Sequence, residues 1–145
     1  MLAGTLRTRC ALALLGAALL LTGFANAQDP RASTAQSAAR QFLALTDRGD
    51  AKASFRASGK QFQNGITEAR WANALGEVRT PVGDVVDRAL ISTEFLRTFP
   101  GAASESDYVI IQYRTSFAKL TGARESLTLE READGVWRVI GYVIR

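Results

Sequence analysis

Residues 108–119 read YVIIQYRTSFAK and carry the clearest secondary-structure signal in the chain. One face of an extended strand would hold Val109, Ile111, Tyr113, Thr115 and Phe117, and the other would hold Ile110, Gln112, Arg114, Ser116 and Ala118. A period of two is typical of a β-strand that buries one face. The stretch therefore predicts a strand of an antiparallel sheet with one face on the core and one face open.

Three further strands are expected around this one. They cover residues 85–95, 124–132 and 136–145. Pro100-Gly101 marks a loop, a turn is expected at residues 121–123, and Asp134-Gly135 is a strong hairpin signal. Apolar residues occupy both faces of the last strand, which indicates a central position in the sheet or cover on both sides.

A three-residue turn at 121–123 predicts a pairing register for the central hairpin. The expected pairs are Phe117–Leu127 and Thr115–Leu129 on the core face, and Arg114–Glu130, Ser116–Thr128 and Lys119–Glu125 on the open face. Apolar residues then meet apolar residues and opposite charges meet, which favours this register. For the last hairpin, a two-residue loop would oppose Arg131 and Arg138, and a bulged turn would pair Glu132 with Arg138.

The part of the chain from residue 33 to residue 79 has a helical period. Helices are expected over residues 33–48, 50–57 and 67–79, with a loop over residues 60–65. Ser33, Asp50 and Thr67 are suitable N-caps, and Ile66 and Trp71 have the spacing of a hydrophobic staple. Three helices followed by about four antiparallel strands predict an α+β domain, with the helices packed on one face of a curved sheet.

Residues 1–27 have the three-part pattern of a secretory signal. Arg7 and Arg9 precede an apolar run at residues 11–21, and Ala25 and Ala27 are small residues at the expected cleavage site. The run is shorter than the ~20 apolar residues that a membrane-spanning helix needs. We therefore expect cleavage after Ala27, a single mature domain over residues 28–145, a periplasmic or secreted location, and no membrane anchor after cleavage.

The composition excludes several kinds of chemistry. The chain has no histidine, and its one cysteine, Cys10, would leave with the signal. This rules out Ser-His-Asp triads, Cys-His pairs and zinc sites built on these ligands. No glycine-rich phosphate loop or calcium loop is present, so we predict no catalytic set, no metal and no cofactor. The charges are 18 Lys+Arg against 14 Asp+Glu, and removal of Arg7 and Arg9 brings them closer to balance, which argues against nucleic acid as a partner.

Four residues are candidates for ligand binding. Arg88 interrupts an apolar stretch and could hold a carboxylate, either of a ligand or, as we favour, of the protein itself. Trp71 and Trp137 could stack on a ligand, although core packing is the commoner role of such residues. Tyr113 shares a face with apolar residues, so its side chain is expected in the core or in a cavity between the helices and the sheet.

Several segments together resemble a known bacterial family. They are Phe42-Leu43-Ala44-Leu45-Thr46-Asp47, Trp71, Arg79-Thr80-Pro81-Val82-Gly83 with the following Arg88, and Gly135-Val136-Trp137-Arg138-Val139-Ile140-Gly141-Tyr142. The chain resembles the exported family catalogued as domain of unknown function 4019. That resemblance implies no activity and no catalytic residue. The order of helices and strands is also similar to nuclear-transport-factor-two-like and cystatin-like domains, a likeness of fold alone.

Two functions remain open from the sequence. The first is a non-catalytic binding or accessory module of the cell envelope, acting on a protein or a small ligand, with a homodimer through the open sheet face as one possibility. The second is a small enzyme with a cone-shaped pocket that uses Asp and Tyr for proton transfer. The enzyme requires a cavity near Tyr108 or Tyr113 with a carboxyl of raised pKa. Filling of that space by Phe42, Trp71, Leu75 and Phe117 would count against it.

Overall fold

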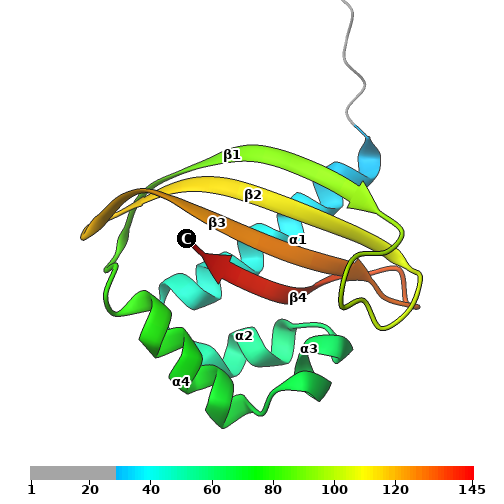
Figure 1. The fold of residues 1–145 in the computed structure, drawn as a ribbon, viewed down its shortest axis with the longest axis horizontal. Coiled ribbons are helices and arrows are strands. Elements are labelled where there is room, and N and C mark those ends of the chain that lie inside the picture. Colours follow the sequence, from blue (N-terminus) through cyan, green and yellow to red (C-terminus); the bar gives the residue numbers. More distant parts are fainter. Residues whose placement is uncertain (1–28) are drawn as a thin grey trace, which may run out of the picture.

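The computed structural model describes residues 29–145, in which four helices precede four strands (Figure 1). The helices are α1 (Pro30–Asp47), α2 (Ala51–Ala57), α3 (Lys60–Gly65) and α4 (Glu68–Arg79). The strands are β1 (Val85–Leu96), β2 (Asp107–Phe117), β3 (Leu120–Arg131) and β4 (Trp137–Ile144). The predicted α+β class is confirmed. The predicted signal, with Ala25 and Ala27, lies outside the described residues.

The capping residues explain where the helices begin. Asp50 and Thr67 cap α2 and α4 as predicted, since the side chain of each accepts a hydrogen bond from the backbone N–H of the third residue of its helix. The prediction for α1 was wrong by one turn. Asp29 is its N-cap and Pro30 occupies its first turn, so Ser33 lies inside the helix.

The expected loop at residues 60–65 is instead the short helix α3. Six residues are too few to show a helical period in the sequence. Contacts with residues outside α3 stabilise it. The Gln63 side-chain amide donates to the carbonyls of Phe55 and Ser58, both at 3.0 Å. The backbone N–H of Lys60 also donates to the Glu132 carboxylate at 2.6 Å.

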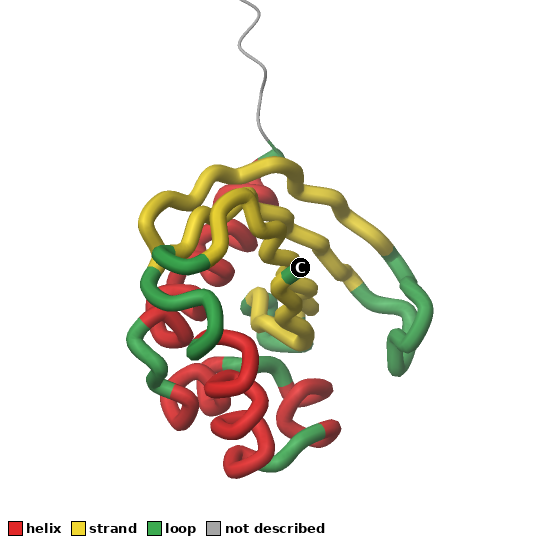
Figure 2. Tube along the Cα trace, turned by 60° about the vertical axis from the view of Figure 1, so that its left-hand side comes forward, coloured by secondary structure: helices red, strands yellow, loops and turns green. Residues whose placement is uncertain are grey.

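The sheet is an antiparallel meander in the order β1-β2-β3-β4. It curves over the helices, which lie on one side of it, so the other side forms an outer face that no helix covers within residues 29–145 (Figures 1 and 2). The suggested central position of the last strand is wrong, because β4 is an edge. Part of that edge is covered by the α2–α3 link, where the Gly59 N–H donates to the Val139 carbonyl at 2.8 Å.

The predicted register of the central hairpin is wrong. The turn lies at Ala118-Lys119 instead of residues 121–123, and a bulge follows Thr115. The observed pairs include Thr115–Ala123, Arg114–Arg124, Tyr113–Glu125 and Ile111–Leu127. This register keeps Leu127 and Leu129 on the core face, and it also turns Glu125 inward and Arg124 outward.

The last hairpin follows neither of the two predicted alternatives. Arg138 lies opposite Glu130, and the Glu132 N–H donates to the Val136 carbonyl at 3.0 Å. The resulting three-residue loop contains Gly135 at φ 79°, a left-handed conformation that glycine adopts readily.

The core fills the space between the helices and the sheet. Its buried members include Phe42, Leu43, Trp71, Leu75, Val109, Ile111, Tyr113, Leu127, Leu129, Trp137 and Val139, and a smaller cluster forms around Phe117. The rings of Phe42 and Trp71 lie 6.2 Å apart, and Tyr142 packs against both. Among residues 29–145, no helix has the length and apolar character needed to cross a membrane.

Candidate functional site

The four predicted ligand-binding residues do not form one site. Trp71 is a core residue whose indole N–H donates to the Ser54 hydroxyl at 2.9 Å. Trp137 is buried beside Phe95, with ring centroids 5.9 Å apart. Tyr113 is buried as well, and its hydroxyl has no hydrogen-bond partner in the described part of the chain. Only Arg88 takes part in a polar cluster, and its partners belong to the protein.

This ion-pair cluster consists of Asp47, Arg79, Arg88, Thr115, Glu125 and Tyr142. One residue comes from each of α1, α4, β1, β2, β3 and β4, in that order. Asp47, Arg79, Arg88 and Tyr142 also belong to the segments on which the family resemblance rests. The cluster therefore ties two helix ends to every strand of the sheet.

Glu125 is the buried centre of the cluster, and its exposed fraction is 0%. One carboxylate oxygen accepts from Arg88 Nε at 2.6 Å and from the Thr115 hydroxyl. The other accepts from the Tyr142 hydroxyl at 2.6 Å and from Arg88 Nη2 at 3.2 Å. A buried carboxylate needs such compensation, because an unpaired one would pay a large desolvation penalty.

Asp47 links the two arginines of the cluster. Its carboxylate accepts from Arg88 Nη1 at 2.8 Å and Nη2 at 2.9 Å, and from Arg79 Nη1 at 2.7 Å. Burial raises the pKa of the Asp47 carboxyl, but the hydrogen bonds from Arg88 and Arg79 outweigh it and hold the pKa below the usual value. Burial lowers the pKa of Arg88, and its bonds to Asp47 and Glu125 raise it above the usual value.

The cluster is thus two guanidiniums matched by two carboxylates. Burial, followed by the neighbouring Glu125 charge, raises the pKa of Tyr142, so its hydroxyl stays protonated and donates to that carboxylate. The Asp47 carboxyl has a lowered pKa, so it stays ionised between the two guanidiniums. Phe42, Trp71, Leu75 and Phe117 are all buried in the space where that enzyme would need its pocket. These observations assign the cluster a structural role.

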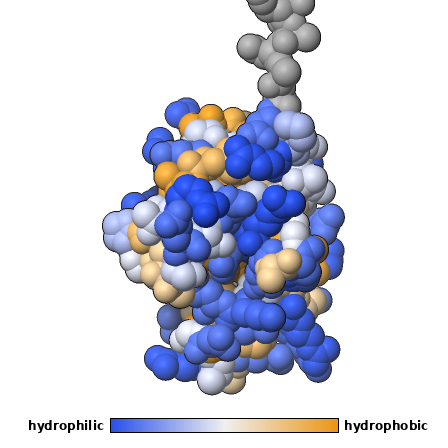
Figure 3. Space-filling view, turned by 90° about the vertical axis from the view of Figure 1, so that its right-hand side faces the viewer, coloured by the Kyte–Doolittle hydropathy of each residue, from blue (hydrophilic) through white to orange (hydrophobic). Residues whose placement is uncertain are grey.

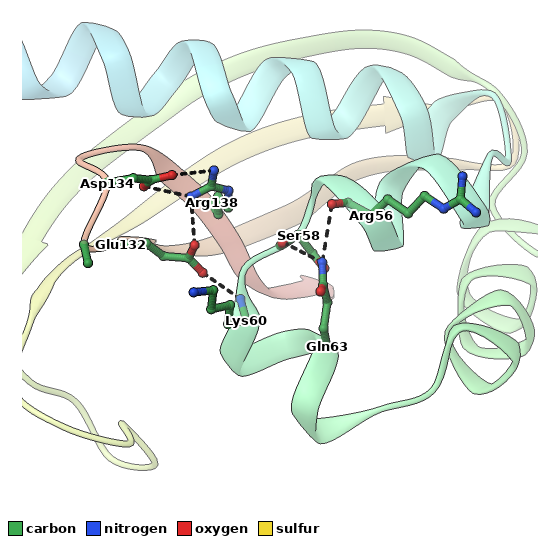
Figure 4. Close-up of a pocket in the computed structure, with 8 residues that line it drawn as sticks. Arg56, Ser58, Lys60, Gln63, Glu132, Asp134 and Arg138 are labelled. Carbon is green, nitrogen blue, oxygen red and sulfur yellow. Dashed lines mark hydrogen bonds and ion pairs between the residues drawn. The ribbon is translucent and has the colours of Figure 1, made fainter.

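A surface hollow of about 370 Å³ lies between the α2–α3 link and the β3–β4 hairpin (Figure 4). One part of its polar wall is an ion-pair group of Arg138, Glu132 and Asp134. Arg138 reaches Asp134 at 2.8 and 2.9 Å and Glu132 at 2.8 Å, and Glu132 also accepts from the Lys60 backbone. The Arg56 guanidinium points away from Arg138. This end of the molecule is mostly hydrophilic, with small separate hydrophobic patches (Figure 3).

The outer face of the sheet carries a different arrangement, the arginine row of Arg114, Arg124 and Arg145. Arg114 and Arg124 are directly opposite each other in β2 and β3. Arg124 and Arg145 exchange two backbone hydrogen bonds, of 2.7 and 2.9 Å. Residues paired in this way point to the same face of a sheet, and all three are exposed.

No carboxylate forms an ion pair with the arginine row within the described chain. The one side-chain bond is neutral, from Arg124 Nη1 to the Gln112 carbonyl oxygen at 3.3 Å. Like charges directly opposite each other destabilise a sheet. An uncompensated row of three cations is therefore a candidate anion-binding surface.

Sequence reasoning predicted an internal carboxylate for Arg88 but did not identify Glu125, and it missed the arginine row, because the predicted register was wrong. The predicted Arg114–Glu130 pair hid the row, because the real neighbour of Arg114 is Arg124. A signal for Glu125 was present, since its period-two relation to Leu127 and Leu129 places it on the core face. A buried Glu facing the core would in turn require a cation such as Arg88.

The comparisons with known proteins agree with the resemblance. A family model described as "Protein of unknown function (DUF4019)" matches residues 38–142, a span that includes the ion-pair cluster, Arg114 and Arg124. A search of curated proteins gives no match. The likeness to nuclear-transport-factor-two-like and cystatin-like domains stays a prediction.

Proposed function

This chain belongs to the DUF4019 family, whose description names no activity, and we propose that it is an exported, non-catalytic binding module of the bacterial cell envelope that holds an anionic partner on the outer face of its sheet. The arginine row is the observation that carries this proposal. Three guanidiniums on adjacent strands repel one another in the free protein, and an anionic partner would remove that repulsion. Guanidinium groups also form paired hydrogen bonds with carboxylates and phosphates.

The outer face is a better binding surface than the ion-pair cluster or the α2–α3 hollow. In the ion-pair cluster the charged groups are joined to opposite charges of the protein. In the hollow, Arg138 is held by Glu132 and Asp134, and these two carboxylates would repel an anion that approaches Arg56 or Lys60. On the outer face, Arg124 has only a neutral partner, so binding breaks no internal ion pair. An external anion therefore gains more at the arginine row than at either other place.

The same row argues against a homodimer through the outer face. Two copies that pack these faces together about an axis through the row would bring six guanidiniums close to each other. We therefore expect the mature domain to be a monomer without an anionic partner. Light scattering coupled to size-exclusion chromatography tests this, and a stable dimer that Arg124→Glu weakens would contradict it.

Export is supported by the signal pattern of residues 1–27 and is tested separately. The full chain with a C-terminal tag is produced in a bacterium, and the periplasmic fraction is isolated. We expect a protein whose first residue is Gln28. Full-length protein confined to the cytoplasm would refute the export part of the proposal.

Anion binding is tested with inorganic tripolyphosphate as a probe of the mature domain at low ionic strength. We expect amide NMR shifts to concentrate at Arg114, Arg124 and their neighbours on the outer face, and to fade as salt screens the charges. Arg124→Gln should reduce these shifts. The matched control Arg70→Gln removes the same charge from an exposed site on α4 and should leave them unchanged. Shifts centred on the α2–α3 hollow would contradict the proposal.

A further inference from the structure

We infer that the arginine row is a site for an acidic glycan, which lies across the strands and places successive acidic groups on successive arginines. This inference rests on the proposed use of the outer face and names the ligand class for it. Three observations lead to it: the spacing of the row, the neutral residues beside it and the charge at its β1 end.

The spacing of the row selects a ligand with repeated charges. Neighbouring strands lie about 4.8 Å apart, so the backbones of Arg114 and Arg145 are separated by roughly 10 Å. A single monovalent or divalent anion cannot neutralise all three guanidiniums, because it carries fewer charges than the row. A linear polymer with an acidic group on each unit can, and clusters of Lys and Arg on a surface are typical of sites for acidic polysaccharides.

The residues beside the row suit sugar hydroxyl groups. Gln112 and Ser116 lie two residues on either side of Arg114, and Ser126 lies two residues after Arg124, on the same outer face. All three are half-buried neutral side chains that can both donate and accept hydrogen bonds. They line the row along the strands, where the hydroxyl groups of a sugar chain would lie.

The other polyanions of an envelope fit this surface less well. A membrane surface is usually bound by several large apolar side chains that enter the lipid, whereas beside the row Val143 is apolar and Gln112, Ser116 and Ser126 are polar. An extended acidic peptide would more naturally add through its backbone to the outer edge of β1, which pairs with no further strand among residues 29–145. On β1, Ala89 lies opposite Arg114, and Asp87 lies opposite Ser116 on the outer face. The negative charge of Asp87 would repel an acidic glycan on that side of the row, so the glycan is expected to run from β2 to β4.

The test measures the affinity of the mature domain for tetragalacturonate, which carries one carboxylate on each sugar. We expect binding that Arg124→Gln and Arg114→Gln each weaken by at least about tenfold, because each removes a charged hydrogen-bonding partner. Arg70→Gln should change the affinity little. A neutral galactose tetramer should not bind, and monogalacturonate should bind much more weakly than the tetramer.

Three further probes separate this inference from the proposed function. Tetraglutamate, tripolyphosphate and vesicles containing phosphatidylglycerol are compared at the same charge concentration. Row-dependent binding of any of these at equal or higher affinity than tetragalacturonate would overturn the glycan assignment and leave the anion-binding function standing. If no probe binds in a way that depends on Arg114 or Arg124, both the inference and the proposed function fail. The folded state of each variant is checked by its urea unfolding curve.

Discussion

Arg124 and Glu125 are neighbours in β3, yet Glu125 is buried among partners and Arg124 is exposed beside like charges. Glu125 points inward and is contacted by Arg88, Thr115 and Tyr142. Arg124 points outward, next to two other arginines and without an acidic partner among residues 29–145. The difference follows from the access of each charge to water. A buried charge must be paired inside the protein, whereas an exposed like-charge pair costs only a fraction of a kcal/mol to about 1 kcal/mol.

The two faces are also linked through the register of the sheet. Since side chains alternate along a strand, placing Glu125 beside Arg88 in the interior necessarily places Arg124 on the outer face. A slip by one residue would bury Arg124 and expose Glu125, Leu127 and Leu129. The inner cluster therefore holds the arginine row in place, and substitutions on the two faces should have opposite consequences.

Removal of Arg88 should have the largest effect. Arg88→Met leaves the buried Glu125 carboxylate without its cation, and loss of one partner of a buried pair costs about 3–5 kcal/mol. The measurement is the free energy of unfolding in urea. As a control, Arg97→Met removes an exposed arginine with two acidic partners and should cost less than about 1 kcal/mol.

A double variant sharpens this prediction. Arg88→Met combined with Glu125→Leu removes both charges from the interior, so part of the lost stability should return. If the double variant is less stable than the single one, the loss in Arg88→Met comes from packing, and the pairing argument is wrong.

A smaller loss is expected for the hydroxyl of Tyr142. Tyr142→Phe removes one donor to the Glu125 carboxylate and should cost about 1.5–3 kcal/mol, the range for hydrogen bonds to charged groups. Tyr108→Phe is the matched control. Its hydroxyl donates to the neutral carbonyl of Ser104 at 2.7 Å, and its loss should cost about 0.5–1.5 kcal/mol. Equal losses would show that the charge of Glu125 adds nothing.

Acid should weaken the inner cluster through Asp47. The pKa of its carboxyl is lower in the folded protein than the value of about 3.9 expected when unfolded. The unfolded state therefore binds more protons near pH 4, so stability rises with pH there. This contribution is complete above the unfolded pKa and disappears as pH falls through the folded one.

The measurement is the free energy of unfolding from pH 7 to pH 3 for the wild type and for Asp47→Asn. The variant should be less stable at pH 7 and should lose less stability on acidification. Asp134, whose bonds from Arg138 and the Val136 N–H lower its pKa to about 2, also contributes an acid dependence. That contribution is common to both proteins and cancels in the difference. Parallel curves would contradict the role assigned to Asp47.

The elements of this fold were largely predictable from the sequence. Asp50 and Thr67 mark two helix starts correctly, and the alternation around Ile111 identifies the central strand. The ion-pair interpretation of Arg88 is confirmed, because an arginine in an apolar stretch needs an internal carboxylate. These features depend on local patterns, which the sequence contains in full.

Pairing between distant residues was much less predictable. The register of β2 with β3 depends on a two-residue turn and a bulge after Thr115, and neither has a strong local signal. Matching opposite charges on the outer face predicted that Arg114 pairs with Glu130. In the structure Glu125 is buried opposite Tyr113, and this register places Arg114 opposite Arg124. The free energy cost of burying one unpaired charge exceeds the gain from several exposed ion pairs. Which charge is buried becomes known only when the whole core is assembled.

The smallest expected effect is the most informative for the outer face. Arg124→Gln removes the middle charge of the arginine row, so the variant should be more stable than the wild type by about 0.2–1 kcal/mol at low ionic strength. Near 1 M salt, where charges more than about 3 Å apart are screened, the gain should disappear. Arg131→Gln, near the other end of β3, should give no such salt-dependent gain. A residue whose removal stabilises the fold and weakens anion binding is retained at the expense of stability, which is the signature of a binding residue. If Arg124→Gln instead lowers stability, the arginines do not repel one another, and the main argument for an anion site is lost.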